Sequence, residues 1–207
     1  MLFFKHKLKS SGPWLGSQWT IPEPCSIELL NNVHHDIIKD ARLIAVVIAG
    51  LGNIGQRFIE LLPAQLNRIY ALENIHLVGL LSSKKALINN DGIEVNSALS
   101  LFKQDAQDYD HQQLLSWLNN HPYDELIMVD ITPSEEFSLL YQDFFALGIH
   151  VIGANKWAAS ASTQHYNQLV NTADKYNSLW LGNTTVGAGL PINYAIEDLK
   201  NSGDKIN

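Results

Sequence analysis

Two kinds of pattern alternate along the chain, short runs that are almost wholly apolar and longer segments with apolar residues at helical spacing. The apolar runs are typical of strands that are buried on both faces of a parallel sheet. They occupy residues 43–49, 75–81, 123–131 and 149–152. Strands that alternate with helical segments predict a Rossmann-type α/β fold, a doubly wound parallel sheet with right-handed crossovers and helices on both faces.

The first helical segments follow the first two strands. Residues 53–72 are expected to form a helix, and Pro63 is expected to kink or split it because proline removes a backbone donor. The polar turn Ser82 to Lys85 closes the second strand. After it, residues 86–120 form an insertion. We expect two helices in this insertion, at residues 95–103 and 111–119.

The later helices carry clearer start and stop signals. Pro133-Ser134-Glu135-Glu136 is typical of a helix start, since acidic residues favour the positive end of the helix dipole. That helix should continue over residues 137–147, with Gly148 as its C-cap. A last helix is expected at residues 192–201, with Pro191 at its start.

The first strand runs directly into a glycine motif. Gly50-Leu51-Gly52-Asn53-Ile54-Gly55 is a G-x-G-x-x-G sequence between an expected strand and an expected helix, the setting in which it indicates dinucleotide binding. Gly50 would permit a tight turn, Gly52 would let a pyrophosphate approach the backbone, and Gly55 would let the helix pack closely. Backbone N–H groups of the helix N-terminus, near Asn53 and Ile54, would face the phosphates. The alternative is a glycine-rich turn with a purely structural role.

Ligands of open parallel sheets bind beyond the carboxyl ends of the strands, so the residues that follow each strand are candidates. The second strand is followed by Ser82, Ser83, Lys84 and Lys85, without the acid that usually accepts the ribose hydroxyls of NAD. Hydroxyls and cations suit a 2′-phosphate and favour NADP, and a solvated surface turn is the equal alternative.

Two further candidates follow the later strands. Thr132 comes after the third strand and could contact the cofactor, or it could belong to a structural turn. Lys156 follows the fourth strand, close to where a nicotinamide would sit, although on position alone a solvated lysine is the commoner case.

Composition narrows the class of protein. The net charge of −7 and the pI near 5.5 argue against non-specific binding to nucleic acid. The single cysteine, Cys25, excludes an internal disulfide and a cysteine-based zinc cluster. No apolar run approaches the roughly 18 residues that span a bilayer. We therefore expect a soluble cytoplasmic protein with neither a membrane nor a nucleic-acid partner.

Four ordered segments carry a resemblance to a known family. GLGNIG, HPYDELIMVDIT, GIHVIGANKWAAS and NTTVGAGLPIN together resemble homoserine dehydrogenase, and in particular the dehydrogenase half of bifunctional aspartokinase–homoserine dehydrogenases of the methionine branch. The resemblance covers about residues 32–207 and does not extend over residues 1–30. Pro13, Pro22 and Pro24 interrupt residues 1–40, which we expect to form an irregular N-terminal extension. The resemblance implies an NAD(P)-binding Rossmann-like domain at 41–207. The implied activity is that of an oxidoreductase of threonine and methionine biosynthesis, which interconverts L-homoserine and L-aspartate 4-semialdehyde with NADP or NAD.

The resemblance also implies roles for single residues. The glycine motif would bind the pyrophosphate, and Thr132 and Lys156 would lie at the nicotinamide, with Lys156 near the reacting substrate as a candidate catalytic residue. The segment 183–190 matches a loop that holds a monovalent cation, Na⁺ or K⁺, chiefly through backbone carbonyls. The matching positions are Asn183, Val186, Ala188 and Leu190.

In the family, a substrate-binding catalytic domain follows the segment that matches the end of this chain, and relatives usually pair through that part. We therefore expect cofactor binding but little turnover from residues 1–207 alone, and the chain could form a homo-oligomer. The alternative is a non-catalytic nucleotide-binding fragment, or a subunit that another polypeptide completes.

Overall fold

The computed structural model describes residues 42–68, 74–182 and 192–202. The extension expected at 1–40 and the cation loop expected at 183–190 lie outside these residues, so both stay predictions. No helix in the described part of the chain is both long and apolar enough to cross a bilayer.

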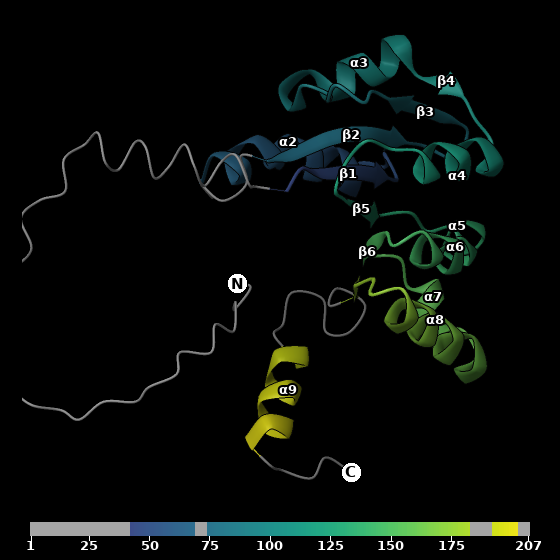
Figure 1. The fold of residues 1–207 in the computed structure, drawn as a ribbon. Coiled ribbons are helices and arrows are strands. Elements are labelled where there is room, and N and C mark those ends of the chain that lie inside the picture. Colours follow the sequence, from purple (N-terminus) through teal and green to yellow (C-terminus); the bar gives the residue numbers. More distant parts are fainter. Residues whose placement is uncertain (1–41, 69–73, 183–191, 203–207) are drawn as a thin grey trace, which may run out of the picture. The chain divides into compact units, whose positions relative to one another are not determined.

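A seven-stranded sheet forms the centre of the described residues, in the order β4-β3-β2-β1-β5-β6-β7 (Figure 1). The five parallel strands are β1 (Ile44–Ala49), β2 (Ile75–Leu81), β5 (Glu125–Asp130), β6 (His150–Gly153) and β7 (Trp180–Leu181). The four strands expected from the apolar runs are confirmed, each within about two residues at either end. They are parallel as predicted.

Two antiparallel strands, which the sequence analysis did not predict, extend the parallel sheet at one edge. They are β3 (Lys85–Ile88) and β4 (Gln107–Asp108), and both belong to the insertion after β2. An antiparallel partner needs only a tight turn. Ser82 supplies this turn, since its N–H donates to the carbonyl of Lys85 at 2.8 Å. Lys85 is therefore the first residue of a strand, whereas the sequence placed it in a polar turn.

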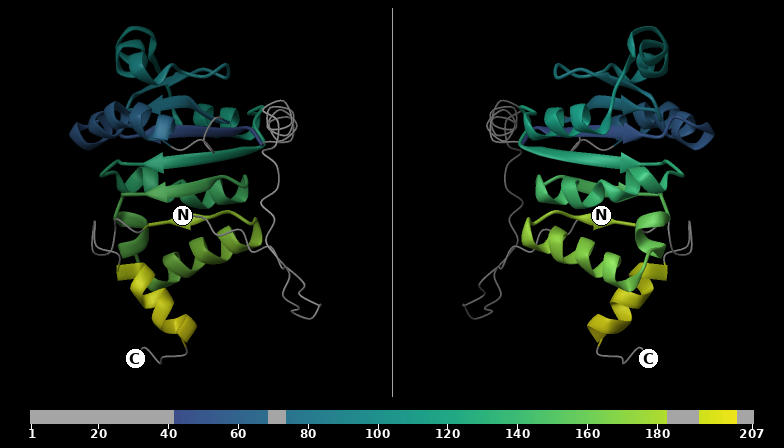
Figure 2. Two further views of the ribbon diagram at one scale, coloured as in Figure 1. Left: turned by 90° about the vertical axis from the view of Figure 1, so that its left-hand side faces the viewer. Right: turned by 90° about the vertical axis from the view of Figure 1, so that its right-hand side faces the viewer.

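Helices lie on both faces of the sheet, which confirms the doubly wound architecture (Figure 2). Ile59 and Ala98, from the helices Asn53–Arg68 and Ala98–Asp105, form one buried cluster with Ile48, Leu80 and Val129. The helices between residues 111 and 175 contribute to the cluster on the opposite face. The helices are α2 (Asn53–Arg68), η2 (Val95–Ser97), α3 (Ala98–Asp105), α4 (His111–Asn119), α5 (Glu135–Leu139), α6 (Tyr141–Ala146), α7 (Trp157–Ser160), α8 (Thr163–Lys175) and α9 (Ile192–Ser202).

The helix boundaries differ from the expected ones at three places. The helix expected at 95–103 is a 3-10 turn, η2, followed by α3, which ends at Asp105. Helix α2 continues through Pro63, so the expected split is wrong: the proline removes one backbone donor, while Ile59 anchors the helix in the core at 1% exposure. The helix expected over 137–147 is instead divided at Leu140, whose N–H bonds the carbonyl of Phe137 in a tighter turn. Ser134 caps α5 as predicted, and Gly148 takes a left-handed φ of 77° just beyond α6.

The order of the strands creates a switch point at β1. The chain leaves β1 for β2 on one side and later returns to β5 on the other, and both pairings are parallel. Ala49, the last residue of β1, is in register with Leu81 and with Asp130. Consequently the residues that follow β1, β2 and β5 leave the sheet side by side, where open α/β sheets bind their ligands.

Candidate functional site

The three glycines of the motif have three different structural surroundings. Gly50 has a φ of 102°, and a Cβ there would lie 2.7 Å from the carbonyl carbon and oxygen of Ile131. A Cβ on Gly55 would lie 1.8 Å from the carbonyl oxygen of Gly50, so the first turn of α2 packs directly on the end of β1. A Cβ on Gly52 would meet nothing within 4 Å. The backbone is therefore closely packed at Gly50 and Gly55, whereas Gly52 has free space beside it.

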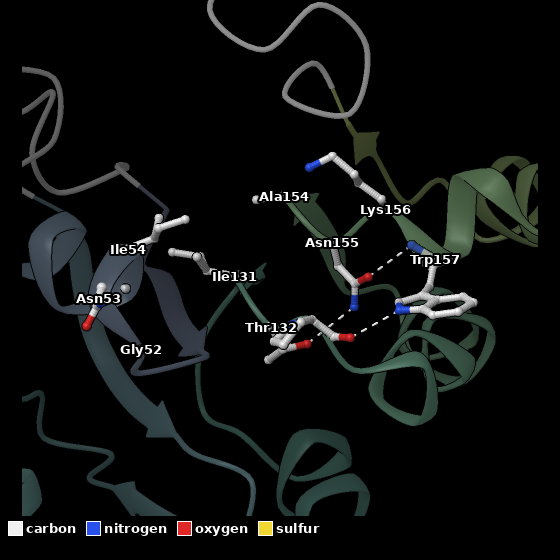
Figure 3. Close-up of a pocket in the computed structure, with 11 residues that line it drawn as sticks. Gly52, Asn53, Ile54, Ile131, Thr132, Ala154, Asn155, Lys156 and Trp157 are labelled. Carbon is white, nitrogen blue, oxygen red and sulfur yellow. Dashed lines mark hydrogen bonds between the residues drawn. The ribbon is translucent and has the colours of Figure 1, made fainter.

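A cavity of about 540 Å³ lies between the N-terminus of α2 and the segments that follow β5 and β6 (Figure 3). Figure 3 shows the Lys156 side chain extending from the start of α7 towards the side formed by Ile54. The Lys156 ammonium has no hydrogen-bond or ion-pair partner among the described residues. The lining residues are Gly52, Asn53, Ile54, Gly55, Ile131, Thr132, Pro133, Ala154, Asn155, Lys156 and Trp157.

A second cavity, of about 440 Å³, lies beside Gly52 and the residues that follow β2 and β5. The two cavities share Gly52, Thr132 and Pro133, so they meet at the switch point. Both volumes fall in the usual range of roughly 300–1,000 Å³ for small-molecule sites. The second is lined by Ala49, Gly50, Leu51, Gly52, Ser82, Ser83, Tyr109, His111, Thr132, Pro133, Ser134, Glu136 and Phe137. Two lobes that meet at an exposed glycine backbone fit the two nucleotides and central pyrophosphate of a dinucleotide.

A buried pair of polar side chains connects the segments after β5 and β6. Asp130 has no exposed surface, and its carboxylate accepts hydrogen bonds from Thr132 N at 2.7 Å and Asn155 Nδ2 at 3.0 Å. Asn155 Nδ2 also lies 2.8 Å from the carbonyl of Ser134, while Asn155 Oδ1 accepts from Trp157 N at 3.0 Å. The pair thus fixes the backbone at Thr132 and at the start of α7, on either side of Lys156.

The Asp130 carboxyl group is surrounded by neutral hydrogen-bond donors. Burial raises the pKa of Asp130, and the hydrogen bonds from Thr132, Tyr141 and Asn155 offset only part of that effect. The Tyr141 hydroxyl donates to Asp130 at 2.8 Å, and burial together with the charge of Asp130 raises the pKa of Tyr141. Tyr141 therefore stays protonated and serves as a fixed donor.

Of the candidate residues that follow β2, some line a cavity and others do not. Ser82 lines the second cavity, but its Oγ is engaged in the turn, where it accepts from Lys85 N at 3.0 Å. Lys84 and Lys85 line neither of the two cavities. Their cofactor-binding roles, like those of the glycines, Asn53, Ile54, Thr132 and Lys156, stay predictions.

Sequence reasoning missed three residues that the fold brings to this region. Asp130 and Asn155 are not among the residues predicted for the site, although an aspartate at the end of an apolar strand signals a buried polar network. His111 reaches the second cavity from the insertion, and no local pattern marks it.

Comparison with known proteins agrees with this geometry. Residues 50–181 match the family described as homoserine dehydrogenase, NAD binding domain. Over 180 aligned residues the chain is 37% identical to bifunctional aspartokinase/homoserine dehydrogenase 2 of Escherichia coli (strain K12). The alignment covers 86% of this chain and 22% of that protein. The chain therefore spans less than a quarter of the length of this curated relative.

Solved structures share the fold. A homoserine dehydrogenase from Thermoplasma acidophilum has a TM-score of 0.59 and 20% identity, over 75% of this chain and 49% of that one. A hyperthermophilic archaeal homoserine dehydrogenase mutant in complex with NADPH has the same TM-score and identity, over 76% of this chain and 49% of that one. At this identity the likeness establishes the Rossmann-like fold.

Proposed function

Since this chain belongs to the family of homoserine dehydrogenase NAD-binding domains, we propose that it holds the nicotinamide dinucleotide for the interconversion of L-homoserine and L-aspartate 4-semialdehyde. The observation that carries this proposal is the backbone around Gly52. The backbone of Gly50 packs against Ile131, and the backbone of Gly55 packs against Gly50. A Cβ on Gly52 would meet nothing within 4 Å, and Gly52 lines both cavities. Such a backbone admits a pyrophosphate to the N-terminus of a helix.

The two cavities suit the two halves of the cofactor. We assign the nicotinamide to the cavity beside Thr132 and Lys156, and the adenosine to the cavity beside Ser82 and Phe137. The bound nicotinamide supplies the hydride chemistry, and the protein supplies orientation and electrostatics.

The residues of the first cavity would orient the reactants. Asn155 holds the Thr132 hydroxyl, at 3.3 Å from its Nδ2, and fixes the backbone before α7 through Trp157. The ammonium of Lys156, free of described partners, would stabilise negative charge on the oxygen of the substrate. We propose that the group that moves the homoserine hydroxyl proton comes from a catalytic domain beyond these residues, which the resemblance implies.

Several finer expectations belong to the same proposal. The lack of an acid among Ser82, Ser83, Lys84 and Lys85 supports NADP as the preferred form. A Na⁺ or K⁺ ion held at Asn183, Val186, Ala188 and Leu190 lies outside the described residues, and replacing both ions by choline during nucleotide titration would test it. A cytoplasmic location, a place in threonine and methionine biosynthesis, and association with a further copy or a completing chain are proposed with it.

Nucleotide titration tests the proposal directly. Trp157 lines the first cavity and is 48% exposed, so bound nicotinamide should quench its fluorescence. We expect saturable quenching of the fluorescence by NADPH or NADH. A Trp157→Phe variant should lose the quenching that comes from Trp157, while calorimetry should still show that it binds the nucleotide. Absence of saturable binding of both nucleotides by the folded chain would overturn the proposal. Assay of homoserine oxidation by the chain alone then separates an active enzyme from the alternative, a nucleotide-binding chain that another polypeptide completes.

A further inference from the structure

The insertion after β2 forms one wall of the second cavity. The Tyr109 hydroxyl donates to the carbonyl of Ser82 at 3.0 Å, and the Tyr109 N–H donates to the carbonyl of Lys84 at 3.1 Å. Asp110 then caps α4, where it accepts from Gln113 N at 2.8 Å in a capping box. These hydrogen bonds join the end of β4 to the turn after β2, and they hold the first residue of α4 beside that turn.

That first residue is His111, and it lines the cavity together with Ser82 and Ser83. It is the one basic side chain among the residues that line this cavity. Lys84 and Lys85 are not among them. Lys85 is opposite Asp108 in the β3–β4 ladder, and its neighbour Ala86 is buried in the core shared with α4, so alternation directs Lys85 to the other face of the sheet.

We propose that His111 recognises the 2′-phosphate that distinguishes NADP from NAD, an inference that rests on the proposed function. An imidazolium donates a charge-assisted hydrogen bond to phosphate, whereas a neutral imidazole offers the same bond without the charge. In either form His111 would favour NADP⁺ over NAD⁺, since only NADP⁺ carries a phosphate at this position.

The other titratable groups around His111 make the effect specific. Glu136, on α5, is the one acidic side chain that lines the cavity, and it opposes a phosphate there. Tyr109 stays neutral because burial raises its pKa. Asp110 and Lys84 are the charged residues next to the hydrogen bonds of Tyr109, and the Asp110 carboxylate accepts a hydrogen bond from Gln113 N. His111 is therefore the one side chain lining this cavity that can offer a positive charge to a phosphate.

The test compares the dissociation constants of NADP⁺ and NAD⁺ by calorimetry at pH 6.0, 7.0 and 8.5, with the full chain. At each pH, the ratio of the NAD⁺ constant to the NADP⁺ constant should be higher in the wild type than in His111→Gln, by up to about tenfold, the size of one charge-assisted hydrogen bond. His111→Gln keeps a neutral donor but cannot carry the positive charge of an imidazolium, so it should lose part of the preference for NADP⁺. Since the 2′-phosphate itself titrates near pH 6, the difference between the two proteins is the quantity to compare.

Two further variants complete the design. His165→Gln, on α8 and away from both cavities, should follow the wild type at every pH. Glu136→Gln should raise the NADP⁺ preference, because it removes the opposing charge. A ratio that is the same in His111→Gln and wild type at all three pH values overturns the inference while the proposed function stands. Failure of the wild type to bind either nucleotide overturns the proposed function instead.

Discussion

The carboxylate of Asp130 accepts a hydrogen bond of 3.0 Å from the side-chain amide of Asn155, which joins the ends of β5 and β6 beside the first cavity. Both side chains are buried, at 0% and 4% exposure. Together they hold Thr132 and the residues around Lys156 in one arrangement. The first prediction concerns this pair.

Asn155→Ala should weaken both the fold and the nicotinamide end of the site. The substitution removes one of the donors to the buried Asp130 carboxylate and leaves Trp157 N without its acceptor, and the loss of these bonds should cost about 1–3 kcal/mol. We expect a lower midpoint of urea unfolding and a weaker NADPH affinity. Asn120→Ala, at an exposed helix end, is the matched control and should leave nucleotide affinity unchanged. Equal NADPH affinity in Asn155→Ala and wild type would contradict the positioning role.

Asp130→Asn should destabilise the chain in a pH-dependent way. An amide nitrogen at position 130 would face Asn155 Nδ2, donor against donor. Burial raises the pKa of Asp130 above its ordinary value of 3.8, so the folded state binds this proton more tightly than the unfolded state. The contribution of this group to stability is full below pH 3.8 and is lost as pH rises through the folded pKa.

The measurement is the difference in unfolding free energy between wild type and Asp130→Asn, from urea titrations between pH 4 and pH 7. The advantage of the wild type should be largest at the acid end and shrink as pH rises. A difference that grows with pH would mean that the carboxyl is stabilised as an anion, contrary to the effect of its burial.

Gly52 and Gly55 should respond in opposite ways to the same substitution. A methyl group on Gly55 would overlap the carbonyl oxygen of Gly50, so Gly55→Ala should lose more than about 4 kcal/mol or fail to fold. A methyl group on Gly52 meets open space, so Gly52→Ala should change stability by less than about 1 kcal/mol. It should nevertheless raise the NADPH dissociation constant roughly tenfold or more, because it fills the approach to the backbone. Thermal unfolding and nucleotide titration of the two variants check both halves, and unaltered NADPH binding by Gly52→Ala would remove Gly52 from the pyrophosphate site.

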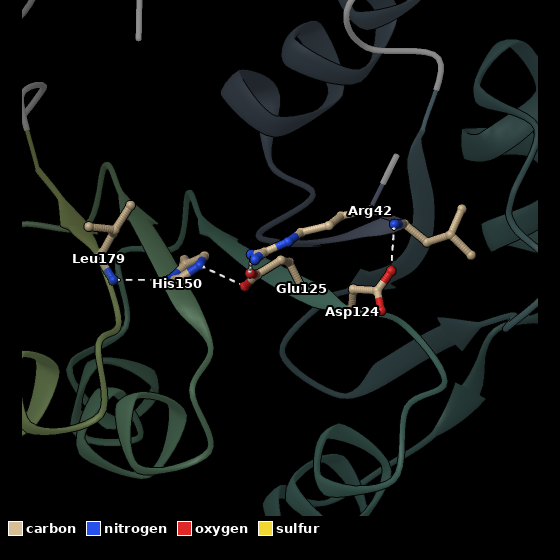
Figure 4. Close-up of polar contacts among 6 residues, drawn as sticks. Arg42, Asp124, Glu125, His150 and Leu179 are labelled. Carbon is tan, nitrogen blue, oxygen red and sulfur yellow. Dashed lines mark hydrogen bonds and ion pairs between the residues drawn. The ribbon is translucent and has the colours of Figure 1, made fainter. Parts of the chain in front are cut away.

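A polar cluster at the amino ends of the strands should contribute to stability without affecting the nucleotide. His150 Nδ1 accepts from Leu179 N at 3.0 Å, and its Nε2 lies 3.0 Å from Glu125 Oε2, while Arg42 contacts the other Glu125 oxygen at 2.6 Å (Figure 4). His150→Phe removes the links from β6 to β5 and to the residue before β7, and should cost about 1–3 kcal/mol. Arg42→Ala should cost less than about 1 kcal/mol because the arginine is 74% exposed. Urea unfolding should give this order, and NADPH affinity should stay at the wild-type value in both variants.

Local sequence determined much of this protein. The apolar runs located the four inner strands because burial on both faces requires near-continuous apolar residues. The glycine spacing located the turn into α2, since only glycine fits a φ of 102° at Gly50 and a carbonyl 1.8 Å from a Cβ on Gly55. The resemblance carried by four segments identified the family, which the match over residues 50–181 confirmed.

Tertiary structure decided what those patterns could not. The edge strands β3 and β4 are too short to give a periodic signal, and their pairing moved Lys85 away from the second cavity while it brought His111 to it. Asp130 and Asn155 are distant in the sequence, and they meet because β5 and β6 are neighbours in the sheet. Periodicity and turn chemistry are local properties of the chain, whereas the order of strands selects which distant side chains share a site.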